Sequence, residues 1–128
     1  MSLDLKYLLF SVLLTFVQVL IAAAAAHQAV GLPTLAGNRD GMGELPGFAG
    51  RARRAHLNMI ENMVLFAPLI IIADIAGRDN GMTELGAELF FGARLACAVL
   101  YVAGVPYLRT LAWAVSVVGL VLIFLQLL

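Results

Sequence analysis

The chain alternates between long apolar stretches and short polar segments, and this pattern predicts four membrane-spanning helices. The apolar stretches cover about residues 5–30, 50–76, 84–104 and 106–128. A helix rises about 1.5 Å per residue, so even the shortest stretch would extend for roughly 30 Å, the thickness of a hydrocarbon core. We therefore expect an all-α integral membrane protein, a single four-helix bundle over residues 1–128.

The breaks between these stretches differ in length. Residues 31–50 hold two prolines, several glycines and the turn sequence Asn38-Arg39-Asp40-Gly41, so we expect one long loop there. Val105-Pro106-Tyr107 leaves room only for a tight turn, which makes the last two spans an antiparallel hairpin. Pro68 lies inside the second span and should kink it, because proline cannot complete the helical hydrogen bond.

The composition agrees with a membrane domain. Hydrophobic residues make up 62% of the chain and charged residues 12%, whereas soluble domains average about 45–50% and 25%. The first apolar run is too long for a signal peptide and lacks a cleavage pattern, so we interpret it as a retained span.

The net charge is zero without a basic stripe, which argues against nucleic acid as a partner. The single Cys97 excludes an intrachain disulfide, and no metal-ligand spacing is present, so no metal site is expected.

The basic residues near the membrane favour one orientation. Four spans place both termini on the same side. That side carries Lys6 and Arg78. The side of the long loop carries five arginines, namely Arg39, Arg51, Arg53, Arg54 and Arg109. By the positive-inside rule, we expect the long first loop in the cytoplasm and both termini on the opposite side.

The second span begins with a row of polar residues at helical spacing. Arg51, Arg54, Asn58 and Glu61 stand at i, i+3, i+7 and i+10, so they share one face of the helix. Such a row is costly in lipid unless it faces protein or trapped water. It is therefore a candidate functional site.

Further polar groups fall at a similar depth, because alternate helix ends meet on the same side of the membrane. They come from the ends of the first and third spans and the start of the fourth, and are His27, Gln28, Tyr101, Arg109 and Thr110. Arg94 lies near the middle of the third span and needs an anionic partner. Glu61 is the obvious candidate, so we expect a structural ion pair between them.

Several guanidiniums with one carboxylate suit a small ligand that carries both carboxylates and an ammonium group. A peptide-like thiol such as glutathione has this charge pattern, and a nearby arginine or hydroxyl would favour its thiolate. A purely structural interpretation stays open. The polar row could only fix helix packing, Arg109 could be an interface arginine, and Tyr101, Tyr107 and Trp113 could belong to an interfacial aromatic belt.

The sequence Arg-Ala-His-Leu-Asn-Met-Ile-Glu at residues 54–61 resembles the second-helix signature of the MAPEG family, the membrane-associated proteins of eicosanoid and glutathione metabolism. The four spans, the long first loop and the order Arg94, Tyr101, Arg109 are similar too, so the resemblance covers nearly the whole chain. It is strongest to the small bacterial branch. The resemblance implies a homotrimer in a bacterial inner membrane, with glutathione as co-substrate, bound between subunits near the cytoplasmic face.

The resemblance also implies an activity and a set of site residues. The activity would be that of a glutathione transferase or peroxidase acting on a hydrophobic small molecule or lipid that enters from the bilayer. Arg109 would be catalytic and would stabilise the thiolate. Glutathione would be bound by Arg51, Arg54, Asn58, Glu61, Tyr101 and Thr110.

Three positions depart from the family pattern. Trp113 stands where several members have tyrosine, Cys97 where some have histidine, and Asn62 where others have an aromatic residue. The departures at Trp113 and Cys97 favour an alternative, a non-catalytic membrane scaffold or accessory subunit that keeps the fold without the chemistry.

Overall fold

The protein is entirely helical. The computed structural model describes all residues, 1–128, and 84% of them are helical, with no strand. The helices are α1 (Leu3–Val30), α2 (Leu32–Ala36), α3 (Gly47–Ile75), α4 (Gly81–Ala103) and α5 (Pro106–Leu127). The four long helices correspond to the four expected spans. The expected loop 31–50 is partly helical, because it contains α2 and because α3 already begins at Gly47.

Local side-chain chemistry explains where α4 begins and ends. The Asn80 side chain accepts hydrogen bonds from the backbone N–H groups of Met82 and Thr83, and the Thr83 hydroxyl accepts from the Asn80 N–H at 2.8 Å. This reciprocal pair satisfies donors that a helix start leaves unpaired. At the other end Gly104 adopts a left-handed conformation with φ of 79°, which a residue without Cβ reaches at little cost. Pro106 then opens α5.

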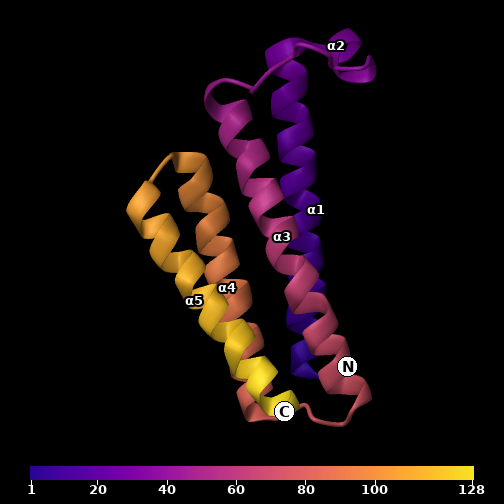
Figure 1. Ribbon diagram of the computed structural model, residues 1–128, viewed down its shortest axis with the longest axis vertical. Coiled ribbons are helices and arrows are strands. Elements are labelled where there is room, and N and C mark those ends of the chain that lie inside the picture. Colours follow the sequence, from indigo (N-terminus) through magenta and orange to yellow (C-terminus); the bar gives the residue numbers. More distant parts are fainter.

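The four long helices form a bundle in which α3 and α4 occupy the centre. Each of these two contacts all three other long helices, whereas α1 and α5 do not contact each other. Both termini lie at one end of the bundle, and α2 lies at the opposite end (Figure 1). The α4–α5 hairpin therefore packs against α3 on one side, and α1 packs against α3 and α4 on the other. α3 continues as one helix through Pro68.

Helices α4 and α5 pack very closely where they cross. A Cβ added to Gly86 would lie 2.7 Å from the Gly119 carbonyl oxygen, and one added to Gly119 would lie 2.5 Å from the Gly86 carbonyl oxygen. Glycine at both positions lets the two backbones touch. Beside this crossing the rings of Phe66 and Phe90 stack with their centroids 3.9 Å apart, within the hydrophobic core.

The outer surface is apolar. Large hydrophobic side chains are exposed along every long helix, as at Leu13, Val64, Val99 and Phe124. The four long helices are long enough and apolar enough to cross a membrane. A surface of this kind would be unstable in water and suits contact with lipid.

Candidate functional site

A polar pocket lies between α3, α4 and α5. Its volume is about 240 Å³, and its walls come from Asn58, Tyr101, Arg109, Thr110 and Trp113. Tyr101 is on the last turns of α4, Arg109 and Thr110 are on the first turns of α5, and Asn58 approaches from α3. The structure thus brings together Asn58, Tyr101, Arg109 and Thr110, which the sequence suggested separately.

Within this pocket the guanidinium of Arg109 lies over the ring of Tyr101, 4.3 Å from its centroid. A cation above an aromatic face is attracted by the ring's negative potential, most strongly where water is scarce. The short turn between α4 and α5 makes the contact possible, because it places the end of one helix beside the start of the next. Tyr101 therefore holds the cation in place as well as lining the pocket.

Arg51 lies outside the pocket and ties two helices together. Its Nε donates a hydrogen bond to the backbone carbonyl of Val102 at 2.9 Å. That carbonyl belongs to the last turn of α4, where backbone acceptors have no partner within the helix. Arg51 thus links the first half of α3 to the end of α4, next to the pocket.

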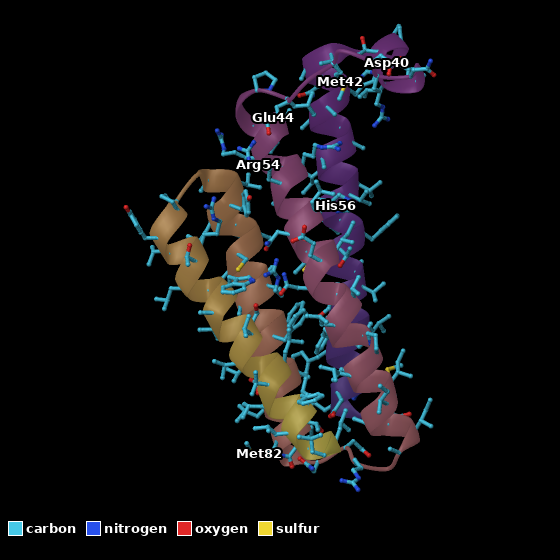
Figure 2. All side chains as sticks on the ribbon, viewed as in Figure 1. Asp40, Met42, Glu44, Arg54, His56 and Met82 are labelled. Atoms are coloured by element: carbon cyan, nitrogen blue, oxygen red, sulfur yellow. The ribbon has the colours of Figure 1, made fainter.

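Arg54 and Glu61 are exposed on α3 and do not line the pocket. Figure 2 shows Arg54 near the end of α3 that lies closer to α2. With about 3.6 residues per turn, the row from Arg51 to Glu61 spreads over roughly 80° of the helix surface. Asn58 reaches the pocket from one edge of the row, and Arg54 and Glu61 stand at the other edge.

The ion pair expected between Glu61 and Arg94 is not formed. Arg94 is only 2% exposed and donates through Nη2 to Asn58 Oδ1 at 2.5 Å. Its Nε and Nη1 are buried without a hydrogen-bond partner. Glu61 lies three residues after Asn58, which turns it about 60° further from the buried face of α3. The expectation was wrong because helical spacing defines a shared face, but not which residue of that face meets the neighbouring helix.

Trp113 also lines the pocket, although its position in the sequence equally suited an interfacial aromatic belt. It is 43% exposed, yet it lines the pocket wall. Its spacing of four residues from Arg109 could have indicated this, because residues at i and i+4 lie on one helix face. Tyr107, which suited the same belt, is 89% exposed and does not line the pocket.

Three other residues that the sequence singled out lie outside the pocket. Cys97 is buried behind the pocket, with its Sγ 3.7 Å from the backbone carbonyl of Arg109. His27 and Gln28 are exposed at the end of α1. No group of three or more His, Cys, Asp or Glu side chains lies close enough together to hold a metal ion.

An apolar groove of about 610 Å³ adjoins the polar pocket. It runs between α3 and α5 and is lined chiefly by aliphatic and aromatic side chains, including Val64, Leu65, Leu69, Val121 and Phe124. Trp113 lines both the groove and the pocket, so the two cavities meet at its ring. A donor-rich pocket therefore opens next to a groove that suits a lipophilic molecule.

Comparison with known families gives a match to the MAPEG family over residues 5–128. The chain belongs to the MAPEG family. The match spans all four long helices and therefore also every residue of the pocket. Together with the length and apolar character of these helices, it identifies an integral membrane protein.

Curated relatives of this MAPEG chain include microsomal glutathione S-transferase 1 of Homo sapiens, 36% identical, and of Sus scrofa, 38% identical, each over 56 residues. In both cases the match covers 44% of this chain and 36% of the relative's length. The chain is thus matched to little more than a third of the length of these relatives. No solved structure matches the chain.

Proposed function

We propose that this MAPEG protein is a membrane-bound glutathione transferase or glutathione-dependent peroxidase. Glutathione is its co-substrate, and the second substrate is a lipophilic electrophile or hydroperoxide. The observation that carries the proposal is the meeting of Asn58, Tyr101, Arg109 and Thr110, from three helices, in one pocket beside an apolar groove. The names of the curated relatives point to the same activity.

In this proposal the residues divide the tasks of binding and chemistry. Arg109 stabilises the thiolate of glutathione, since a nearby guanidinium favours an ionised thiol by about one to three orders of magnitude. Asn58 and Thr110 bind the tripeptide, and Tyr101 holds Arg109 over its ring. The thiolate sulfur then attacks the electrophilic atom of the second substrate, whose leaving group departs with the bonding electrons.

Arg51, Arg54 and Glu61 belong to the proposed site although they do not line the pocket. Small-molecule sites usually enclose about 300–1,000 Å³, whereas this pocket encloses about 240 Å³. A wall supplied by a neighbouring copy would enlarge it and would cover the exposed Arg54 and Glu61. We therefore include in the proposal a homotrimer in which glutathione lies between subunits, with its carboxylates on the arginines and its ammonium on Glu61.

The lipophilic substrate enters sideways from the bilayer through the groove between α3 and α5. Membrane partitioning already concentrates such a molecule, so catalysis consists mainly of activating the thiol and positioning the two reactants. In this proposal the long loop and the pocket lie at the cytoplasmic face, with both termini opposite; the excess of arginines on the side of the long loop supports this orientation. The membrane we propose is a bacterial inner membrane.

The test is the ultraviolet difference spectrum of glutathione bound to detergent-purified protein. We expect a thiolate band with the wild type, its loss with Arg109→Ala, and its retention with Arg78→Ala, an exposed arginine at the far end of the bundle. A wild type that binds glutathione without a thiolate band would remove the role of Arg109. Failure to bind glutathione at all would remove the function.

The second candidate is a non-catalytic membrane scaffold or accessory subunit. Trp113 favours it, because this bulky side chain occupies the junction between the pocket and the groove, where the two reactants would have to meet. This candidate predicts no binding of glutathione at millimolar concentration by calorimetry. It also predicts stoichiometric purification with a larger membrane complex.

A further inference from the structure

Arg94 is a buried cation without an anion. It lies in the middle of α4, is 2% exposed, and makes one side-chain hydrogen bond, from Nη2 to Asn58 Oδ1 at 2.5 Å. Its Nε and Nη1 are enclosed and unpartnered. A guanidinium in this position is costly unless something compensates its charge. Within one chain, the carbonyl oxygen of Asn58 is the one acceptor that hydrogen-bonds to it.

This hydrogen bond fixes which way the Asn58 amide points. Arginine has five N–H donors and no acceptor, so the atom of Asn58 that faces it must be the carbonyl oxygen. A neighbouring contact holds the same turn in place, since Asn62 Nδ2 donates to the backbone carbonyl of Asn58 at 2.8 Å. The amide nitrogen of Asn58 makes no hydrogen bond within the chain, and Asn58 lines the pocket. The pocket side of Asn58 therefore presents two N–H donors.

Arg109 has the same character as Asn58, because a guanidinium can only donate. Thr110 differs, because its hydroxyl donates its one hydrogen to the carbonyl of Pro106 at 3.2 Å and leaves its oxygen as an acceptor. No carboxylate lines the pocket. Arg94, directly behind Asn58, adds a second positive charge to that of Arg109.

We propose that Arg94 is a positioning residue that holds Asn58 as a donor and thereby selects a carboxylate group in the ligand. This inference rests on the proposed function and adds how the pocket selects its ligand. Arg94 does not touch the ligand. It acts by preventing the amide from flipping, which would turn an acceptor toward the ligand, and by placing an uncompensated positive charge behind the amide. The ligand class is an anion with carboxylates, such as glutathione, rather than its diester, which keeps the ammonium group but has no carboxylate.

The first test needs no ligand and measures the melting temperature of detergent-purified variants. In the wild-type background, Asn58→Asp places a carboxylate on the buried guanidinium, and we expect the melting temperature to rise. In an Arg94→Met background the same Asn58→Asp change buries a carboxylate without a partner, and we expect the melting temperature to fall. If Asn58→Asp changes the melting temperature in the same direction in both backgrounds, Arg94 does not orient Asn58.

The second test compares the affinities for glutathione and for glutathione diethyl ester by calorimetry. We expect the wild type to prefer glutathione by about ten- to hundredfold, the range of a charge-assisted hydrogen bond. Arg94→Met should bring the ratio of the two affinities near one. Arg94→Lys, which keeps a charged donor, should retain the preference. Arg53→Met, which removes an exposed arginine of α3, should leave the ratio unchanged.

A merely structural role for Arg94 predicts a different pattern. Loss of packing would weaken the binding of both ligands to the same extent. An unchanged ratio of the two affinities in Arg94→Met would therefore overturn the proposal. If the wild type binds neither ligand, the proposed function and the selectivity both fail. The melting temperatures then still decide whether Arg94 orients Asn58.

Discussion

The two halves of the α4–α5 hairpin differ in packing and polarity. Near its open end, where α4 begins and α5 finishes, Gly86 and Gly119 bring the two backbones into contact, and Phe66 of α3 stacks on Phe90. Near its turn, the same two helices and α3 leave a polar pocket with a buried cation beside it. The first half is packed closely around apolar side chains, and the second half brings charged and amide side chains together.

The packed half stabilises the fold, and the half with the pocket is available for binding. Close packing of small residues gives strong helix association in lipid, where no hydrophobic effect drives helices together. The unpaired donors around the pocket contribute nothing to stability and are costly to bury. The packed half therefore offsets this cost and fixes the register in which Tyr101, Arg109 and Asn58 meet.

The largest effect is expected from Gly119→Ala. The added Cβ would lie 2.5 Å from the Gly86 carbonyl oxygen and 3.0 Å from the Phe90 nitrogen, so the helices must separate. We expect a loss of about 1–3 kcal/mol in the free energy of unfolding, as for overpacked cores. The measurement is thermal unfolding in detergent. Gly92→Ala is the matched control, because nothing lies within 4 Å of its Cβ, and equal losses for both would contradict the packed crossing.

The next effect concerns the pocket and should leave the fold intact. Tyr101→Leu removes the ring beneath Arg109, whereas Tyr101→Phe keeps it. A cation–π contact contributes about 0.5–2 kcal/mol, so we expect Tyr101→Leu to lower kcat/KM by roughly two- to thirtyfold. Steady-state assays with glutathione and a lipophilic electrophile give the result. If Tyr101→Phe loses as much activity as Tyr101→Leu, the hydroxyl rather than the ring is responsible.

A smaller effect is expected where α4 begins. Asn80→Ala removes the cap that accepts from Met82 and Thr83, and also the hydrogen bond from Nδ2 to Gln126 Oε1 at 3.2 Å. Loss of a cap costs about 1 kcal/mol. We expect a lower melting temperature with unchanged glutathione affinity, because Asn80 belongs to the packed half. A change in affinity would show that the two halves are coupled.

The smallest effect on stability is expected from Glu61→Gln. Because Glu61 is exposed and not paired with Arg94, the free energy of unfolding should change by less than about 0.5 kcal/mol. A loss of several kcal/mol, measured by thermal unfolding, would indicate a buried ion pair after all. Glutathione affinity should fall in the same variant, since Glu61 is proposed to bind the ammonium.

The sequence was sufficient for the fold, because membrane helices are long apolar runs whose ends carry recognisable caps such as Asn80 and Gly104. It also indicated Tyr101, Arg109 and Thr110 as neighbours, because the short turn between α4 and α5 leaves only one arrangement. The partner of Arg94 could not be deduced. The choice between Asn58 and Glu61 depends on the rotation of α3 against α4, which packing across the whole bundle decides. Helix α2 was missed because Pro33 and the flanking Gly31 and Gly37 resemble a turn.

The central claim is that the pocket between α3, α4 and α5 binds glutathione, and Trp113 offers the most direct test. It is the only tryptophan in the chain, and it lines the pocket. Titration of detergent-purified protein with glutathione should produce a saturable change in tryptophan fluorescence, and Asn58→Ala should shift the midpoint to higher concentration. Fluorescence that stays constant up to millimolar glutathione, in protein that remains folded, would contradict the claim.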